Sequence, residues 1–181
     1  NLYIIDLDGS SRIVGHDVKL TNGLGFSPDG KTLYVSNEED ATASFVDVES
    51  GKVFSEVEIG EEPEGVQVTA DGSTVYVASE AANIVHVIDT ATAQVKADIL
   101  VGTRPRRFAL TPDEKELWVS AELAGQVDII DTTTNQTNGD IVFLPTGFRR
   151  NEVTPVDILM TRDGKTVYVA LGRANHVAVV D

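Results

Sequence analysis

DGSTVYVAS, residues 71–79, couples an Asp-Gly turn signal to a run of strand-forming residues. Similar stretches begin at Asp29, Asp113 and Asp163, so the four turns are spaced by 42, 42 and 50 residues. Gly supplies the positive φ that a tight hairpin turn requires, and Val, Tyr and Thr favour strands. A repeated stretch at a nearly fixed spacing indicates a repeat architecture, in which each repeat is one supersecondary unit.

Each repeat is predicted to contain four short strands. In the second complete repeat the strands cover 65–69, 74–79, 84–89 and 94–101. No segment keeps the 3.6-residue hydrophobic period that would indicate a helix. Four antiparallel strands in a repeat of about 40–45 residues are typical of a β-propeller blade. The sequence therefore predicts an all-β fold, a β-propeller; a parallel β-helix, whose repeats are shorter and less hairpin-like, is the structural alternative.

We expect a single, partial propeller domain over residues 1–181, with blade units at 1–20, 21–60, 61–101, 102–150 and 151–181. The first unit supplies only the third and fourth strands of a blade, and the last unit supplies the first three. If these two units closed a four-bladed ring, their shared blade would contain the third strand twice. About four blades are therefore visible, and we expect them to be part of a seven-bladed propeller.

The third strand of each repeat has one uniformly apolar face and one face that tolerates polar residues. On the tolerant face, the same position is occupied by Ser44, His86 and Asp128. We interpret His86, together with His16 and His176, as structural, because no two of the histidines are spaced as a pair of metal ligands.

The composition is strongly acidic, with 14 Lys and Arg against 29 Asp and Glu and a formal net charge of −15. Such a surface disfavours nucleic acid and anionic lipid, because phosphates attract basic surfaces. The absence of cysteine excludes disulfides, thiolate metal sites and a cysteine nucleophile. No apolar run approaches the roughly 20 residues that span a bilayer.

Charged residues concentrate in the loops that precede the first strand and follow the second strand of each repeat. In a propeller, these loops emerge at the same end of the central channel. Five arginines stand out there: Arg104, Arg106, Arg107, Arg149 and Arg150. They either bind an anionic ligand through planar, bidentate donors or form ion pairs with carboxylates such as Glu64, Glu80 and Glu122.

Three acidic residues are further candidates, namely Glu64, Glu122 and Asp157. Neighbouring carboxylates can act as acid and base or bind a metal; the alternative is that they are solvated or paired with arginine. Eight extra residues within 135–151 indicate a binding loop or elongated, twisted strands. No phosphate-binding loop or nucleophile elbow is present. We therefore predict these arginines and acidic residues as a candidate ligand- or partner-binding site, with no catalytic residue, metal or cofactor.

The runs YVSN (34–37) and YVAS (76–79) each lie between an Asp-Gly turn and a strand that ends in Asp, and this pattern resembles the YVTN family of β-propellers. Further segments resemble the propeller proteins associated with pyrroloquinoline-quinone (PQQ)-dependent alcohol catabolism. These segments are EPEGV (62–66), RPRRF (104–108), ELWVSAE (116–122) and VALGRANHVAVVD (169–181).

The resemblance implies an exported, periplasmic, seven-bladed protein encoded beside quinoprotein dehydrogenases and c-type cytochromes. We therefore expect a non-enzymatic propeller that binds a small ligand or a partner, such as a quinoprotein dehydrogenase or a c-type cytochrome, and supports PQQ-dependent oxidation. A lactonase-like, metal-dependent hydrolase and a cell-surface or S-layer interaction module are the alternatives. We expect no nucleic-acid partner and no membrane span.

Overall fold

The computed structural model describes residues 2–5, 7–15 and 21–181, and these are almost entirely β-structure. At the N-terminus, β1 (Leu2–Ile5) and β2 (Ser11–Gly15) form a two-stranded antiparallel sheet. The predicted structural histidine His16 lies outside the described residues.

Three four-stranded antiparallel sheets and one three-stranded sheet follow in sequence order. The first contains β3 (Thr21–Phe26), β4 (Thr32–Asn37), β5 (Thr42–Asp47) and β6 (Lys52–Glu58). The second contains β7 (Pro63–Val68), β8 (Thr74–Ser79), β9 (Ile84–Asp89) and β10 (Gln94–Leu100). The third contains β11 (Pro105–Leu110), β12 (Glu116–Ala121), β13 (Gln126–Asp131) and β14 (Gln136–Val142). The last contains β15 (Pro155–Met160), β16 (Val167–Leu171) and β17 (His176–Val180).

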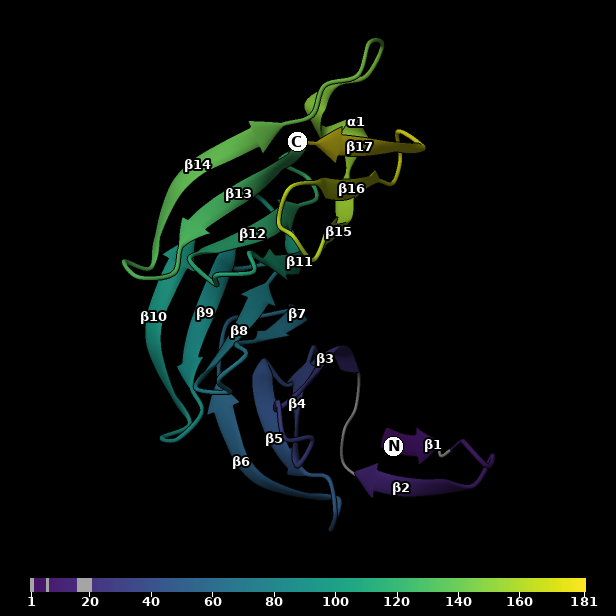
Figure 1. The fold of residues 1–181 in the computed structure, drawn as a ribbon, viewed down its shortest axis with the longest axis vertical. Helices are drawn as coiled ribbons and strands as arrows, with labels where there is room; N and C mark the ends of the chain where they lie inside the picture. The colour runs from purple at the N-terminus through teal and green to yellow at the C-terminus, as the bar shows by residue number, and fades with distance from the viewer. Residues whose placement is uncertain (1, 6, 16–20) are drawn as a thin grey trace.

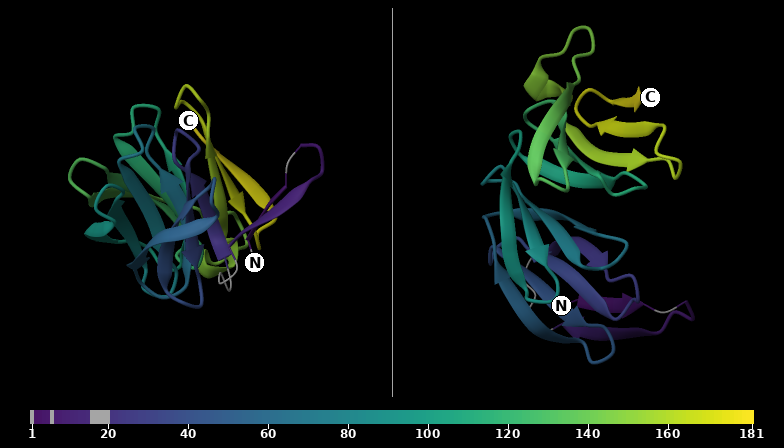
Figure 2. Two further views of the ribbon diagram at one scale, coloured as in Figure 1. Left: turned by 90° about the horizontal axis from the view of Figure 1, so that it is seen from below. Right: turned by 60° about the vertical axis from the view of Figure 1, so that its left-hand side comes forward.

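The sheets are arranged as blades around an inner edge. They follow one another along an arc, with β6, β10 and β14 on its outer side and β3, β7 and β11 on its inner side (Figure 1). Figure 2 shows the same succession from two other directions. The first strands of successive blades, β3, β7, β11 and β15, pack against one another. The predicted all-β propeller of four-stranded antiparallel blades is therefore confirmed.

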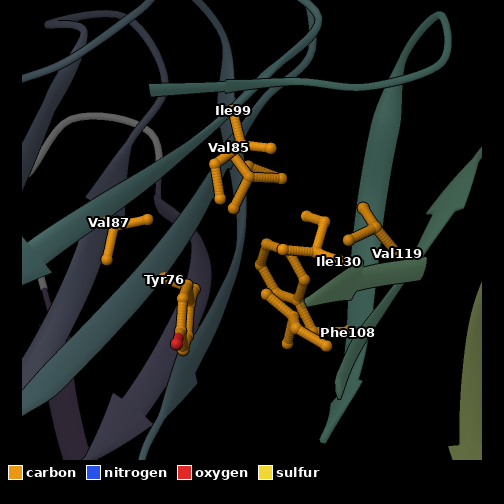
Figure 3. Close-up of a cluster of buried hydrophobic side chains, with 9 residues drawn as sticks. Tyr76, Val85, Val87, Ile99, Phe108, Val119 and Ile130 are labelled. Carbon is orange, nitrogen blue, oxygen red and sulfur yellow. The ribbon is translucent and has the colours of Figure 1, made fainter. Parts of the chain in front are cut away.

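Apolar faces of neighbouring blades form the core. Tyr76, Val85 and Ile99 of the second four-stranded sheet pack in one buried cluster with Phe108 and Ile130 of the third (Figure 3). Residues two apart in a strand share a face, so the β-rich runs of the repeat place their apolar side chains together. Burial of this apolar surface between blades is the main force that holds the arc together.

The Asp-Gly turns are built alike in every blade. In the second four-stranded sheet, the Asp71 carboxylate accepts hydrogen bonds from the Thr69 hydroxyl (2.7 Å) and the Ser73 amide (2.9 Å). These bonds lower the pKa of Asp71, although the group is fully exposed, because they stabilise its charged form. Glu114 takes the place of the glycine in one turn and adopts the same left-handed conformation, with φ 55°.

The polar face of the third strand is buried, although the sequence indicated only that it tolerates polar groups. His86 Nε2 accepts the Gly60 amide at 2.9 Å, and Asp128 Oδ2 accepts the Gly102 amide at 2.8 Å. His86 Nδ1 also lies 2.6 Å from the Asp98 carboxylate. A histidine and an aspartate thus do the same task in successive blades, holding the segment that leads into the first strand.

The extra residues within 135–151 do not lengthen the strands, because β14 has seven residues, as β6 and β10 do. They form instead a connecting segment at 143–149 and the one-turn helix α1 (Arg150–Val153), which the sequence did not predict. Of the two alternatives for this insertion, elongated strands are wrong; the extra residues form a loop and a short helix, and a binding role for them stays a prediction.

Candidate functional site

The site begins at an irregularity in the first strand of each blade. In β7 the pairing with β8 shifts between Pro63 and Val66, and in β11 the pairing with β12 shifts between Pro105 and Phe108. A bulge of this kind bends a strand and re-aims its side chains. The residues within the two bulges include Glu64 and the pair Arg106 and Arg107.

Gly65 allows the two bulges to approach closely. A Cβ atom at position 65 would lie 2.2 Å from the backbone oxygen of Arg106, which is far inside van der Waals contact. On the neighbouring strand, Ser120 fixes the bulge, because its hydroxyl accepts the Arg107 amide at 3.1 Å. Glycine in one blade and serine in the next thus bring Glu64 within reach of the two arginines.

Glu80 and Glu122 follow directly after β8 and β12 and occupy equivalent positions, 42 residues apart. Arg104 Nε lies 2.6 Å from Glu80 and 3.4 Å from Glu122. Glu80 also accepts a hydrogen bond from Arg106 Nη1, which lies 3.3 Å from Glu122. Arg106 Nη2 lies 3.5 Å from Glu64.

Arg107 completes the arrangement with an Nη1 contact of 2.6 Å to Glu64. Three guanidinium groups and three carboxylates therefore interlock at the inner edge of two adjacent blades, with no net charge. We call these residues the inner-edge cluster: Glu64, Glu80, Arg104, Arg106, Arg107 and Glu122.

The carboxylates of the cluster are buried and the arginines form its surface. The side chain of Glu80 is only 3% exposed, whereas those of Arg104 and Arg107 are 40% and 35% exposed. Burial raises the pKa of Glu64, and the hydrogen bond from Arg107 and the charge of Arg106 oppose this rise. The hydrogen bond to Glu80 raises the pKa of Arg104, because it stabilises the protonated, charged guanidinium.

A cavity of about 430 Å³ lies beside the cluster, between the second and third four-stranded sheets. The amide of Arg104 is held by Asn83 Oδ1 at 2.9 Å, and Arg104 Nε by Glu80. Within the described part of the chain, the two Nη groups of Arg104 make no hydrogen bond. The lining residues are Glu62, Glu80, Ala81, Asn83, Thr103, Arg104 and Leu123.

The structure brings together five of the eight predicted site residues, namely Glu64, Arg104, Arg106, Arg107 and Glu122. Of the two alternatives for the first three arginines, ion pairing with Glu64, Glu80 and Glu122 is what the structure shows. Glu80, which contacts two arginines, was expected only as an ion-pair partner. The 42-residue spacing of Glu38, Glu80 and Glu122 is the sequence signal that identifies it.

Three predicted residues lie elsewhere. Arg149 and Arg150 belong to the start of α1, where Arg150 Nε donates to the Ala124 carbonyl at 3.1 Å, beside a second cavity of about 440 Å³. Asp157 was expected in a loop, but β15 begins at Pro155, so Asp157 is an exposed strand residue. It borders a cavity of about 200 Å³ with Leu159 on the last blade.

The cluster does not fit the metal site that a metal-dependent hydrolase requires. A divalent cation needs carboxylate oxygens directed at the ion. Here each carboxylate is directed at a guanidinium. Across residues 2–5, 7–15 and 21–181, no group of three or more His, Asp or Glu residues is arranged to hold a metal ion.

Fold and site together define a β-propeller with an interlocked arginine–glutamate site at its inner edge. The family model described as "SMP-30/Gluconolactonase/LRE-like region" matches residues 1–142, and the chain belongs to this family. Among solved structures, "Kuenenia stuttgartiensis Hydrazine Synthase" is similar at 28% identity with a TM-score of 0.82. The match covers 92% of this chain and 47% of that chain, so the present chain spans about half its length. No curated protein matches the chain.

Proposed function

We propose that the protein is a binding propeller whose inner-edge cavity takes a small molecule that carries a carboxylate. The observation that carries this proposal is the hydrogen bonding of the Arg104 guanidinium and its place in the cavity wall. Its guanidinium Nε is anchored by buried Glu80, its Nη groups make no hydrogen bond within the described residues, and Arg104 lines a cavity. A planar guanidinium with a free edge is suited to bind a carboxylate through two parallel hydrogen bonds.

The wider role also belongs to this proposal. An exported, non-enzymatic propeller that serves PQQ-dependent alcohol oxidation, with a quinoprotein dehydrogenase or c-type cytochrome as partner, is supported by the sequence resemblance alone. No helix among the described residues has the length and apolar character to cross a membrane.

Carboxylate binding is tested with propionate by calorimetry and by NMR titration of the purified chain. We expect a millimolar Kd, weakened by about tenfold or more in Arg104→Gln, because a hydrogen bond to a charged group contributes about 1.5–3 kcal/mol. Arg162→Gln, which removes an exposed arginine at the turn between β15 and β16, is the matched control and should bind as the wild type does. Equal binding by wild type and Arg104→Gln would refute the assignment.

Lactone hydrolysis is the second candidate, because the family that matches residues 1–142 includes gluconolactonase in its description. The test measures turnover of gluconolactone by the purified chain with Ca²⁺, Mn²⁺ or Zn²⁺ and after chelation. Turnover that chelation abolishes would favour this activity over simple binding, and the absence of turnover with all three metals would remove it.

A further inference from the structure

Opposite charges line the cavity beside the inner-edge cluster. Arg104 lies on one part of its wall and the exposed Glu62 on another. Glu62 is close enough to contribute to the raised pKa of Arg104, after the larger effects of Glu80 and Glu122. Glu80 faces the cavity as well, but its carboxylate is already held by Arg104 and Arg106. The cavity thus offers one carboxylate, from Glu62, and one guanidinium edge to a ligand.

The backbone fixes the positions from which both side chains extend before any ligand arrives. Glu62 and Arg104 occupy equivalent positions and both adopt the left-handed conformation, with φ of 53° and 66°. The carbonyl of Glu62 accepts the Glu80 amide at 2.9 Å, and the carbonyl of Arg104 accepts the Glu122 amide at 2.8 Å. A backbone that is already held in this way does not have to be ordered when a ligand binds, which favours affinity.

The rest of the wall is mixed. Leu123 and Ala81 provide apolar surface, while the Thr103 hydroxyl and the Asn83 amide nitrogen provide polar groups. The Asn83 oxygen is already used by the Arg104 amide, so its nitrogen is the group left for a ligand. The volume of about 430 Å³ lies within the roughly 300–1,000 Å³ typical of small-molecule sites.

The overall charge of the protein restricts the class of ligand. A net charge of −15 repels a free anion at long range, and Arg104 repels a cation at short range. A molecule with one positive and one negative group has no net charge, so neither repulsion applies to it as a whole. Such a molecule also matches the two charges on the wall.

We propose that this cavity binds a zwitterionic α-amino acid with an aliphatic side chain. The carboxylate lies against the Nη groups of Arg104, the ammonium group against Glu62, and the side chain against Leu123. This inference rests on the carboxylate site proposed above and adds to it the ammonium site and the apolar contact.

The test compares leucine with two analogues, each lacking one charge: 4-methylpentanoate, without the amine, and 3-methylbutylamine, without the carboxylate. Calorimetry on the wild-type chain should give leucine as the tightest ligand of the three. Glu62→Gln should weaken leucine by about fivefold to tenfold, as expected for a partly exposed ion pair, and leave 4-methylpentanoate at least as tightly bound. Glu61→Gln, which removes the neighbouring exposed carboxylate outside the cavity lining, should leave leucine binding unchanged.

The outcomes separate the two proposals. If 4-methylpentanoate binds wild type as tightly as leucine, the ammonium site is refuted and the carboxylate site stands. If Glu62→Gln weakens both ligands equally, the ammonium assignment is also refuted. If no carboxylate binds, both proposals fail. Because Glu62 is exposed and makes no side-chain hydrogen bond within the described residues, Glu62→Gln is expected to fold as the wild type does.

Discussion

Replacing Gly65 by alanine tests whether the close approach of β7 and β11 builds the inner-edge cluster. The added Cβ would lie 2.2 Å from the Arg106 carbonyl oxygen and 3.3 Å from the Arg107 Cα, whereas unstrained contacts are about 3.5 Å or longer. The strands must therefore separate by about 1 Å, and the obstructing atoms belong to the backbone rather than to a flexible side chain. Overpacking costs about 1–3 kcal/mol, and the rigid obstruction places Gly65→Ala near the upper value.

In thermal unfolding followed by circular dichroism, this loss corresponds to a fall in Tm of about 6–12 °C for a domain of this size. Gly139→Ala is the matched control, because nothing lies within 4 Å of the position that its added methyl group would take in β14. The control should be unchanged or more stable by up to about 1 kcal/mol, since alanine restricts the unfolded chain. A loss below about 0.5 kcal/mol in Gly65→Ala, or an equal loss in both variants, would refute the close-approach argument.

Two further predictions concern single blades. His86→Ala should destabilise the fold by about 1–3 kcal/mol, because the Gly60 amide loses its hydrogen-bond acceptor. His86→Asp should lose less stability, since Asp128 accepts the equivalent amide in the next blade. The urea midpoints of unfolding measure both losses, and an Asp variant less stable than the Ala variant would contradict the shared role. The pKa of Asp71 is lower in the folded protein than its ordinary value of 3.8, so the ionised carboxylate stabilises the fold at pH values above 3.8. This contribution is lost as the pH falls below 3.8 toward the folded pKa. Asp71→Asn should therefore be less stable than wild type at pH 7, with a difference that shrinks below about pH 3.8; a pH-independent difference would show that the carboxylate charge is not the cause.

The blade architecture was predictable because it depends on local signals that recur. In the second complete repeat, the strands 74–79 and 84–89 have the predicted bounds. The first strand begins two residues earlier than predicted, at Pro63, because Pro63 still pairs with Ser79 before the bulge. Bulges, the buried hydrogen bonds of His86 and the helix α1 depend on contacts between strands, and a periodic pattern does not reveal them.

The candidate site was only partly predictable, because it depends on what differs between equivalent positions rather than on what repeats. Before the prolines that open β7, β11 and β15, the same left-handed position holds Glu62, Arg104 and Thr154. A cavity with opposite charges therefore forms between the blade that has Glu62 at this position and the blade that has Arg104 there. At the next blade junction, the equivalent position after that of Arg104 is occupied by Thr154. The Thr154 residue is buried, and its hydroxyl accepts the Arg173 amide at 2.7 Å. The same backbone geometry thus carries a charged pair at one blade junction and a satisfied neutral group at the next, which is why we assign the ligand to the first.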